Sequence, residues 1–487
     1  MIYVLIKTKS QNLSMHKTLP QQLFYILFFV LLAACRQSGS PIGDLLFKQT
    51  KNKVYKEVNT DSLHTYFKNY LETNTNLFKN PKYLTRFYTN ANFEPVLITK
   101  FYADSSLFRL IDFLKRVEEH GLSTRSYKAD TLYDALVQLS GRKDMKVDEA
   151  YACIVRAELL AAEALTRYAF ALEYGMTNPR KVLPRYYIPV SRPDSVSFDR
   201  VLSVENLKHY LDSIQPKSGA YRAMQKALIN ENHGAKKIAL IANMERLRWK
   251  YKMDSTHLIY VNIPAYQLYI IRDRSTKGQM KVVVGKADGH ETPMLASKIH
   301  SVQVNPIWNI PTSIAKKEIL VQAKADKYYL ANHGMDVYRR GVKIANPDTI
   351  DWSVYNEENL PYSFKQQPGN TNSLGLIKFL FKNGSSVYLH DTPAKAVFSR
   401  SMRAASHGCV RVEKPLDLAR ALFGEGEKYD LIKEEMSSEE PVAKTIGLKP
   451  QVPVVLDYVT CKMDSSSTLK FYPDVYKLDS LLYRSLK

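Results

Sequence analysis

Cysteine is scarce in this chain: its 487 residues include only four, Cys35, Cys153, Cys409 and Cys461. So few thiols exclude a small fold held together by disulfides, and each cysteine has to be interpreted singly. The length exceeds one ordinary domain and predicts about two or three folding units, each large enough to form a core. A content of 45% hydrophobic and 11% aromatic residues excludes a wholly disordered chain.

Acidic residues are too few to balance the basic ones: 48 Asp and Glu face 69 Lys and Arg, which gives a formal net charge of +21. This excess predicts an anionic partner, such as nucleic acid or a carboxylate-rich polymer. The chain lacks a dense basic block interleaved with aromatic residues, and it lacks a recognisable nucleic-acid-binding module. We therefore predict no nucleic-acid partner.

The apolar run near the N-terminus is short: Leu23–Ala34 has twelve residues, whereas a membrane-spanning helix needs about 20. The run has the length of a signal-peptide core and follows a basic leader. It ends in Leu32-Ala33-Ala34-Cys35, which resembles the lipobox of bacterial lipoproteins, and a plain secretory signal is the alternative. The resemblance implies that Cys35 is acylated, so that the mature protein is held on a membrane by its lipid.

The signal predicts an extracytoplasmic protein, with residues 1–35 as the signal peptide and 36–60 as a polar tether. No aspartate follows Cys35, since Arg36 and Gln37 occupy the next positions. By resemblance to lipoprotein sorting in bacteria with two membranes, this implies a periplasmic protein anchored to the outer membrane.

Apolar residues recur at helical spacing in the first half of the folded body. One helix is predicted from Leu107 to Val117, before Gly121, and a longer one from about Val147 to Tyr174. Further helices are expected near 61–79, 130–140, 205–214 and 220–229. These apolar stripes predict the core of an all-helical domain over 61–250, in preference to a binding groove.

The spacing of apolar residues changes from helical to alternating near residue 257. Strands are predicted at His257–Val261, Tyr266–Arg272, Met280–Val284, Ile299–Val304, Leu376–Phe381 and Val387–His390. A turn is expected at Lys277-Gly278. Between the strands, Pro311–Gly369 has helical pieces and little strand character. An insertion of this length is typical of a lid, and a structural flap that completes the core is the alternative.

The predicted fold class is therefore α+β with several domains. An all-helical domain over 61–250 is followed by a mainly antiparallel β domain over 251–487, which contains a lid insertion at about 311–369.

Reactive side chains concentrate near the last predicted strand. Cys409 follows Gly408, whose backbone freedom lets amide N–H groups point at a developing oxyanion. His390, at the end of a strand, is placed to activate the thiol, because the thiolate is the nucleophilic form. Three interpretations compete for Cys409: a buried structural thiol, a zinc ligand together with His390 and His407, and a catalytic nucleophile. Polar surroundings and the lack of a fourth ligand favour the nucleophile.

The segment Ser406-His407-Gly408-Cys409-Val410-Arg411, with His390 nineteen positions before the cysteine, resembles the active-site signature of L,D-transpeptidases with the YkuD catalytic fold. Longer motifs resemble the large YcbB-type murein transpeptidases: Asn305–Ile314, Gln367–Asn370, Leu374–Phe379 and Tyr388–Pro393. Upstream, Gly121–Tyr127 and the helix end from Arg167 to Pro179 are similar to the helical scaffold domain of that group. The resemblance covers about residues 60 to 480.

The chain departs from that group in one respect. Its members usually carry a peptidoglycan-binding module between the scaffold and the catalytic domain. Here about seven residues separate the predicted helices Tyr221–Asn230 and Ile238–Trp249. We expect the module to be absent, so that glycan binding depends on the lid, the scaffold and the positive charge.

The resemblance implies roles for the residues of the signature. Cys409 would be the nucleophile and His390 the proton acceptor and donor, while the backbone N–H groups of Gly408 and Cys409 would form the oxyanion hole. Asp391 or a backbone carbonyl would orient His390. Four further residues are expected to bind the substrate or line its pocket: Ser406, His407, Arg403 and Arg411. No metal and no cofactor are expected.

The implied activity is that of a cysteine acyltransferase acting on peptidoglycan stem peptides. Cys409 would attack the carbonyl of the third residue, usually diaminopimelate, expel the terminal D-alanine and form a thioester. An amine of a second stem would then form a 3–3 cross-link, water would give a carboxypeptidase product, and a free D-amino acid would give an exchanged stem. Two alternatives remain: a stem-peptide hydrolase with the same thiol, and a non-catalytic lipoprotein that binds the cell wall.

Overall fold

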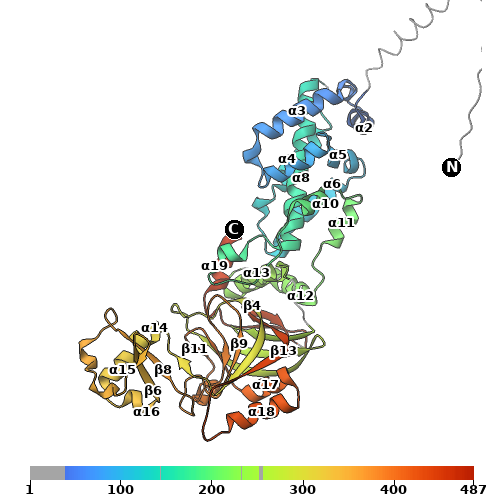
Figure 1. The fold of residues 1–487 in the computed structure, drawn as a ribbon. Coiled ribbons are helices and arrows are strands. Elements are labelled where there is room, and N and C mark those ends of the chain that lie inside the picture. The colour runs from blue at the N-terminus through green and yellow to red at the C-terminus, as the bar shows by residue number, and fades with distance from the viewer. Residues whose placement is uncertain (1–38, 143, 232, 252–255, 465, 487) are drawn as a thin grey trace, which may run out of the picture. The chain divides into compact units, whose positions relative to one another are not determined.

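The computed structural model describes residues 39–486 except 143, 232, 252–255 and 465 (Figure 1). The predicted signal peptide, the lipobox and Cys35 lie outside the described residues. The chain divides into two compact units. The first comprises the residues up to Ile111 with Asp130–Ala164 and Leu202–Leu207, and the second comprises Asp112–Ala129, Leu165–Val201 and Lys208–Lys487. The domain boundary between residues 250 and 251 stays a prediction.

The first unit is helical. Its elements are α2 (Pro41–Thr50), η1 (Lys53–Glu57), α3 (Thr60–Thr73), η2 (Thr75–Leu77), α4 (Pro81–Asn90), α5 (Val96–Phe101), α7 (Ala129–Gln138), most of α6 (Ser106–Lys115) and the first part of α8 (Val147–Tyr174). Phe67 and Tyr88 pack in its core with ring centroids 4.8 Å apart. Buried Glu158 caps α5 by accepting hydrogen bonds from the N–H groups of Leu97 and Ile98, at 2.9 and 2.8 Å. Burial raises the pKa of Glu158 to about 7.

From Ser40 onward, the segment predicted to be a tether is folded, so that prediction is wrong there. The Ser40 side chain accepts a hydrogen bond from the Gly43 N–H at 2.9 Å and caps α2. Ile42 and Leu46 of this helix are buried. The helix has only ten residues, and its half-buried Leu45 and Phe47 blur the spacing of the buried apolar positions, so its periodic signal is too weak to be recognised.

Further helices belong to the second unit. They are η3 (Val117–His120), η4 (Thr124–Ser126), α9 (Pro179–Val182), α11 (Leu207–Ser213), α12 (Gly219–Ile229), α13 (Ala235–Arg248), α19 (Leu478–Ser485), most of α10 (Ser195–Leu202) and the last part of α8. The connection from α12 to α13 is too short to contain another folded module.

A mixed sheet of nine strands forms the centre of the second unit, in the order β11-β3-β12-β10-β9-β4-β13-β1-β2. An additional pairing of β2 with β3 closes the sheet on itself. The strands are β1 (His257–Asn262), β2 (Gln267–Arg272), β3 (Ser275–Gly285), β4 (Leu295–Val304), β9 (Ile377–Phe381), β10 (Leu389–His390), β11 (Ala404–Ser406), β12 (Val410–Val412) and β13 (Lys444–Asp457). Side chains of α17 (Pro415–Phe423), α18 (Glu427–Met436) and α19 join the core of the sheet. A separate hairpin pairs β14 (Cys461–Met463) with β15 (Leu469–Phe471).

The predicted order of a helical part followed by a mainly antiparallel β part is confirmed, and all six predicted strands are present. The predicted turn at Lys277-Gly278 is wrong, because both residues belong to β3. The chain turns instead at Asp273 and Arg274, which have positive φ angles of 50° and 59°. Two consecutive left-handed residues match the backbone of a tight hairpin turn, although neither is a glycine.

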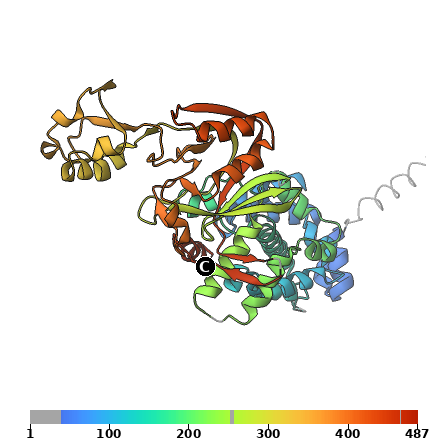
Figure 2. The ribbon, with the colours of Figure 1, turned by 90° about the horizontal axis from the view of Figure 1, so that it is seen from below.

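The lid segment (Pro311–Gly369) folds around its own core. Its sheet, which begins just before the segment, has the order β5 (Trp308–Asn309), β8 (Tyr362–Gln366), β6 (Met335–Arg339), β7 (Val342–Lys343). Its helices are α14 (Thr312–Ile314), the π-helix η5 (Ala315–Ile319), α15 (Leu320–Ala325) and α16 (Tyr329–Asn332), followed by the short turns η6 (Pro347–Thr349) and η7 (Trp352–Val354). Figures 1 and 2 show these yellow to orange elements gathered in one group. Trp352 is buried against Phe364 in this core. The expected lack of strands is therefore wrong.

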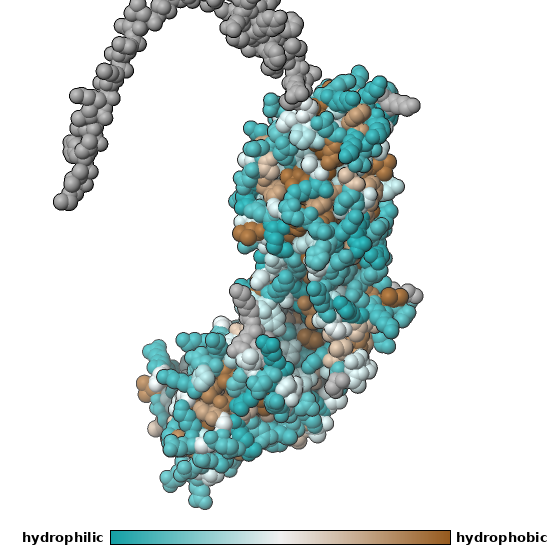
Figure 3. Space-filling view, turned by 90° about the vertical axis from the view of Figure 1, so that its right-hand side faces the viewer, coloured by the Kyte–Doolittle hydropathy of each residue, from teal (hydrophilic) through white to brown (hydrophobic). Residues whose placement is uncertain are grey.

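One face of the molecule is shown in Figure 3. Hydrophilic residues cover most of the face shown in Figure 3, and hydrophobic residues form small groups there. None of the described helices is both long and apolar enough to cross a membrane.

Candidate active site

Strand pairing places the reactive side chains on one face of the sheet. β10 runs parallel to β12, with His390 opposite Arg411. The preceding residue of each strand belongs to the hydrophobic core. Because successive side chains of a strand point to opposite faces, His390 and Arg411 lie on the other face, with Tyr388 and Cys409 two positions before them. Lys378 of β9 lies opposite His390 and shares this face.

Tyr388 acts on the Cys409 thiol through its backbone and its side chain, and both contributions lower the pKa of the thiol. Burial raises the pKa of the Cys409 thiol, although Tyr388 and the charges of Arg411 and Lys378 act in the opposite direction. Burial also raises the pKa of Tyr388, so its hydroxyl keeps its proton. The resting sulfur is therefore a thiol and needs a base to become a nucleophile.

The ring of His390 is neutral and fixed in orientation. Its Nδ1 lies 2.6 Å from the backbone carbonyl oxygen of Asp391. A carbonyl only accepts hydrogen bonds, so Nδ1 carries the proton and Nε2 is the basic nitrogen. Burial, helped by the charge of Arg411, lowers the pKa of His390 to about 4. A backbone carbonyl, and not the Asp391 carboxylate, therefore orients the ring.

The Asp391 carboxylate stabilises the neighbouring loop instead. It accepts a hydrogen bond from the Leu376 N–H at 3.0 Å and forms an ion pair with Lys395. A Cβ added at Gly375 would lie 2.4 Å from its Oδ2 atom, and Gly375 has a positive φ of 61°. Only glycine lets the two loops approach so closely.

The loop before Cys409 is held by backbone and hydroxyl hydrogen bonds. Gly408 has a φ of 110°, which favours glycine, and its N–H donates to Ser406 Oγ at 3.2 Å. Ser406 Oγ donates to the Cys409 carbonyl at 2.5 Å, and Thr292 Oγ1 donates to the Gly408 carbonyl at 2.9 Å. Ser406 is 2% exposed, so it shapes the loop and does not line an open pocket.

His407 faces the lid segment. Its Nε2 lies 2.5 Å from Oε1 of Glu318, which belongs to η5. The His290 ring packs edge-on against it, with centroids 4.7 Å apart. Burial lowers the pKa of His407, and Glu318 opposes this effect.

The two arginines predicted to bind substrate have different surroundings. Arg403 is buried, and its guanidinium donates to the carbonyls of Val282, Arg400 and Tyr266 at 3.1, 2.7 and 3.0 Å. Its donors are therefore engaged in the fold. Arg411 has a buried Nε without a hydrogen-bond partner in the described part of the chain. Burial lowers the pKa of Arg411, which lies within electrostatic reach of both Cys409 and Glu318.

Comparison with known proteins identifies two families in the chain. Residues 256–423 match YkuD, the L,D-transpeptidase catalytic domain, and residues 82–228 match the Scaffold domain family. The segment 256–423 is thus similar to L,D-transpeptidase catalytic domains. Its position after a scaffold domain confirms the resemblance that the sequence motifs indicate.

Individual proteins are similar to this chain over part of its length. A Haemophilus influenzae protein named "Putative L,D-transpeptidase" is 32% identical over 297 residues, which cover 59% of this chain and 59% of that protein. The chain thus matches about three fifths of the relative's length. Two solved structures are also similar to part of this chain. An L,D-transpeptidase from Mycobacterium smegmatis has 13% identity and a TM-score of 0.21, and the match covers 42% of this chain and 58% of that chain. An Ldtfm–avibactam carbamoyl enzyme has 10% identity and a TM-score of 0.19, and the match covers 42% of this chain and 49% of that chain.

Sequence reasoning missed three side chains around the cysteine of the L,D-transpeptidase domain. Tyr388 and Lys378 had a usable signal, because even spacing along a strand and the pairing of β9 with β10 place both on the His390 face. Glu318 had no such signal, since it comes from the lid segment and reaches His407 only through the tertiary fold.

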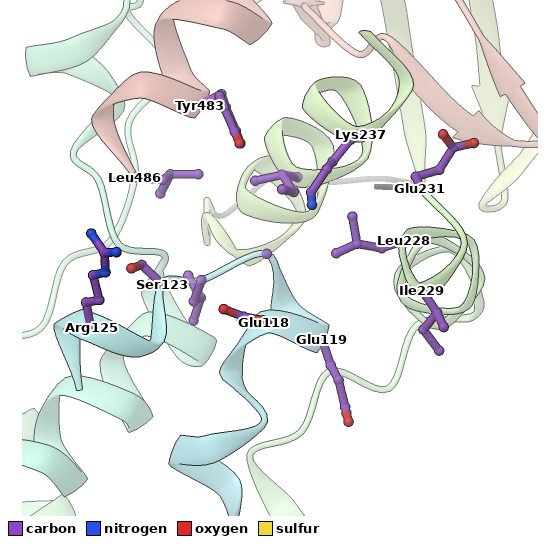
Figure 4. A pocket seen from close by; sticks show the side chains of 13 residues that line it. Glu118, Glu119, Ser123, Arg125, Leu228, Ile229, Glu231, Lys237, Tyr483 and Leu486 are labelled. Atoms are coloured by element: carbon purple, nitrogen blue, oxygen red, sulfur yellow. The ribbon is translucent and has the colours of Figure 1, made fainter. Parts of the chain in front are cut away.

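A cavity in the second unit is lined by none of the residues around Cys409. It has a volume of about 560 Å³ and is lined by η3, α12, α13 and α19 (Figure 4). Its lining includes Glu118, Glu119, Arg125 and Lys237 but neither a cysteine nor a histidine. It therefore carries no nucleophile of the predicted kind.

The ligand geometry of a metal site is not found in the described residues. No three His, Cys, Asp or Glu side chains among them are grouped so that they could hold one ion. His390, His407 and Cys409 accordingly do not form the zinc site considered from the sequence.

Proposed function

We propose that the protein is a peptidoglycan L,D-transpeptidase in which Cys409 is the nucleophile and His390 the general base. One observation carries the proposal. The half-buried Cys409 thiol directly precedes β12, the neutral His390 imidazole belongs to the neighbouring strand β10, and the segment that contains both is similar to L,D-transpeptidase catalytic domains.

Acylation follows from the charge states of the two side chains. His390 accepts the thiol proton as the Cys409 sulfur attacks the carbonyl of the third stem residue. The tetrahedral intermediate then collapses, the D-alanine nitrogen takes the proton from His390 and leaves, and a thioester remains.

The thioester is resolved by an amine from a second stem. The amine nitrogen attacks the acyl carbon, its proton passes through His390 to the departing sulfur, and the new amide is a 3–3 cross-link. Water in place of the amine would release a tripeptide and make the enzyme an L,D-carboxypeptidase.

Backbone donors near the sulfur are suited to stabilise the oxyanion. The predicted donors are the N–H groups of Gly408 and Cys409, but that of Gly408 is engaged with Ser406 Oγ and would have to be released. The backbone of Tyr388 acts on the Cys409 thiol, so its N–H is a further candidate donor near the reacting atom.

Arg411 is suited to hold a carboxylate of the stem peptide. Its Nε lacks a partner in the described residues, and a buried guanidinium gains most from a charge-assisted hydrogen bond. The net charge of +21 favours the same acidic polymer at longer range. Arg403 is not proposed for this role, because its donors are engaged.

Product analysis on a purified disaccharide tetrapeptide tests the proposal. We expect release of D-alanine and formation of cross-linked dimer. Cys409→Ala should abolish both with little change in Tm, and His390→Ala should slow both at least about a hundredfold. Tripeptide without dimer would support the hydrolase alternative, and binding without turnover would support the cell-wall-binding lipoprotein. Equal turnover by Cys409→Ala and wild type would contradict the mechanism.

We also propose that the protein works outside the cytoplasm, because peptidoglycan is there. Export and outer-membrane anchoring through Cys35 are supported by the sequence of the N-terminal segment.

A further inference from the structure

The lid segment contacts the catalytic domain through an acidic residue. Glu318 is the residue before the last of the π-helix η5, whose first and last residues, Ala315 and Ile319, are buried in the lid core. Its side chain is 47% exposed and lies 2.5 Å from His407 Nε2. π-Helical turns occur frequently at functional sites, and this one points its carboxylate toward the catalytic loop.

Glu318 is the exception in charge among the groups around the sulfur. Lys378 and Arg411 are cationic, and both act electrostatically on Cys409. His407, the partner of Glu318, lies two residues before Cys409, so the Glu318 carboxylate lies beside the catalytic loop. A donor stem that carries carboxylates gains nothing from this negative charge. The second substrate of a transpeptidase is different, because its reacting group is an amine.

An amine of the lysine type has a pKa of about 10.4, so at neutral pH it reaches the enzyme as an ammonium. A half-exposed carboxylate is a suitable partner for such a cation. Its present partner, His407, is neutral because burial lowers its pKa, and an exposed pair of this kind is weak. An arriving ammonium therefore replaces a weak interaction with a stronger one.

We propose that Glu318 forms the acceptor subsite of this enzyme and selects a cationic amine by exchanging His407 for the ammonium. The inference rests on the proposed transpeptidase function. Glu318 would hold the ammonium beside the catalytic loop, on the lid side of the thioester. Before attack the ammonium gives one proton to the Glu318 carboxylate, which passes it to solvent, and a second proton then passes through His390 to the departing sulfur. Glu318 would thereby favour the amine over water without taking part in acylation.

The test compares Glu318→Gln with wild type and with Glu357→Gln. Glu357 is an exposed glutamate of the same lid segment, so this variant makes the same chemical change away from His407. The donor is a purified tetrapeptide muropeptide. The acceptor is a tripeptide stem with a free side-chain amine, and a stem with that amine acetylated is the blank.

We expect Glu318→Gln to lower the ratio of dimer to hydrolysed tripeptide about tenfold at limiting acceptor, through a higher acceptor KM. Added salt should raise the acceptor KM of wild type and of Glu357→Gln but not that of Glu318→Gln, because salt screens the charge pair. The first D-alanine release should be unchanged within about twofold in all three proteins.

Three outcomes would overturn the proposal: an unchanged product ratio in Glu318→Gln, an equal change in Glu357→Gln, or a loss of acylation together with transfer. A fall in kcat with an unchanged acceptor KM would also overturn it, because that pattern belongs to a structural contact that holds the lid. Absence of D-alanine release from wild type would instead contradict the transpeptidase function, so the two failures are distinguishable.

Discussion

Burial determines the charge state of both side chains in the proposed catalytic pair. It raises the pKa of the Cys409 thiol and lowers that of His390 to about 4. A resting thiolate–imidazolium pair would require the pKa of the thiol to lie below that of the imidazole. The thiol therefore loses its proton during attack and not before it, so reactivity depends on a bound carbonyl. We expect general thiol reagents to modify Cys409 slowly compared with acylating substrates.

The pH profile of acylation follows from the pKa of His390. A carbapenem is a suitable probe, because its strained β-lactam carbonyl imitates the acyl group of the donor. Only the unprotonated ring accepts a proton, so the rate at which this probe acylates Cys409 should fall as the pH drops through about 4, and not near the ordinary histidine value of about 6.5. Arg411→Gln removes a charge that lowers this pKa and should move the midpoint to higher pH. Mass spectrometry of the intact protein measures the adduct. A wild-type midpoint at about 6.5 would contradict this interpretation.

Substitutions of Arg403 and Arg411 should have different effects, the first on stability and the second on activity. Arg403→Gln leaves three carbonyls with fewer donors and should lower the free energy of unfolding by about 1–3 kcal/mol, measured by denaturant titration. Arg400→Gln, an exposed neighbour, is the control and should be neutral. Arg411→Gln should lower activity while leaving stability nearly unchanged. Equal loss of stability in both buried variants would refute the distinction.

At the scale of elements, the sequence could predict which side chains of the site share one face of a strand, because side chains alternate along a strand. Alternation alone places Tyr388 on the same strand face as His390, and Cys409 on the same face as Arg411. The parallel pairing of β10 with β12 could not be predicted, because the two strands have two and three residues and lie in different parts of the chain. Short segments form strands because of the strands they pair with, and their own composition does not determine this.

The lid segment illustrates the same limit. Its strands β5 and β7 have two residues each, and β6 pairs with β8 across more than twenty residues of chain. The sequence predicted the helical pieces of this segment correctly but not its sheet. Of its aromatic residues, Trp352 is a core residue, whereas Tyr328 is 59% exposed. Exposed Tyr328 and the lysines of the segment are thus the groups available to an acidic polymer.

Loosening the lid core should change the fate of the thioester. Trp352→Ala removes a buried ring and should cost the lid about 3–5 kcal/mol. We expect hydrogen exchange to increase in the lid and not in the closed sheet, and products to shift from dimer to tripeptide, because water then competes better. Val354→Ala, an exposed position of the same turn, is the control. An unchanged product ratio with an unfolded lid would reject its role in excluding water.

At the scale of the whole molecule, the net charge and the cellular location are predicted from the sequence alone. The anchor residue Cys35 lies outside the described residues. If it is acylated, wild-type protein should fractionate with outer membranes, and Cys35→Ala should appear as an uncleaved or soluble form. Immunoblots of fractionated cells make the measurement. Soluble wild-type protein would refute the anchor without affecting the catalytic proposal.

The pairing of β5 with β8 has a consequence for how the lid could be exchanged. Trp308 lies opposite Gln366 and Asn309 opposite Lys365, so the chain enters and leaves the segment through two adjacent antiparallel strands. The lid segment has a hydrophobic core of its own beyond this strand pair, which we call the stalk, so it could be exchanged as a unit. A two-residue turn joining Asn309 to Lys365 would excise it, and a lid from a relative could be grafted on the same stalk. The grafted lid would then determine the preference for the acceptor, while Cys409 would remain the nucleophile.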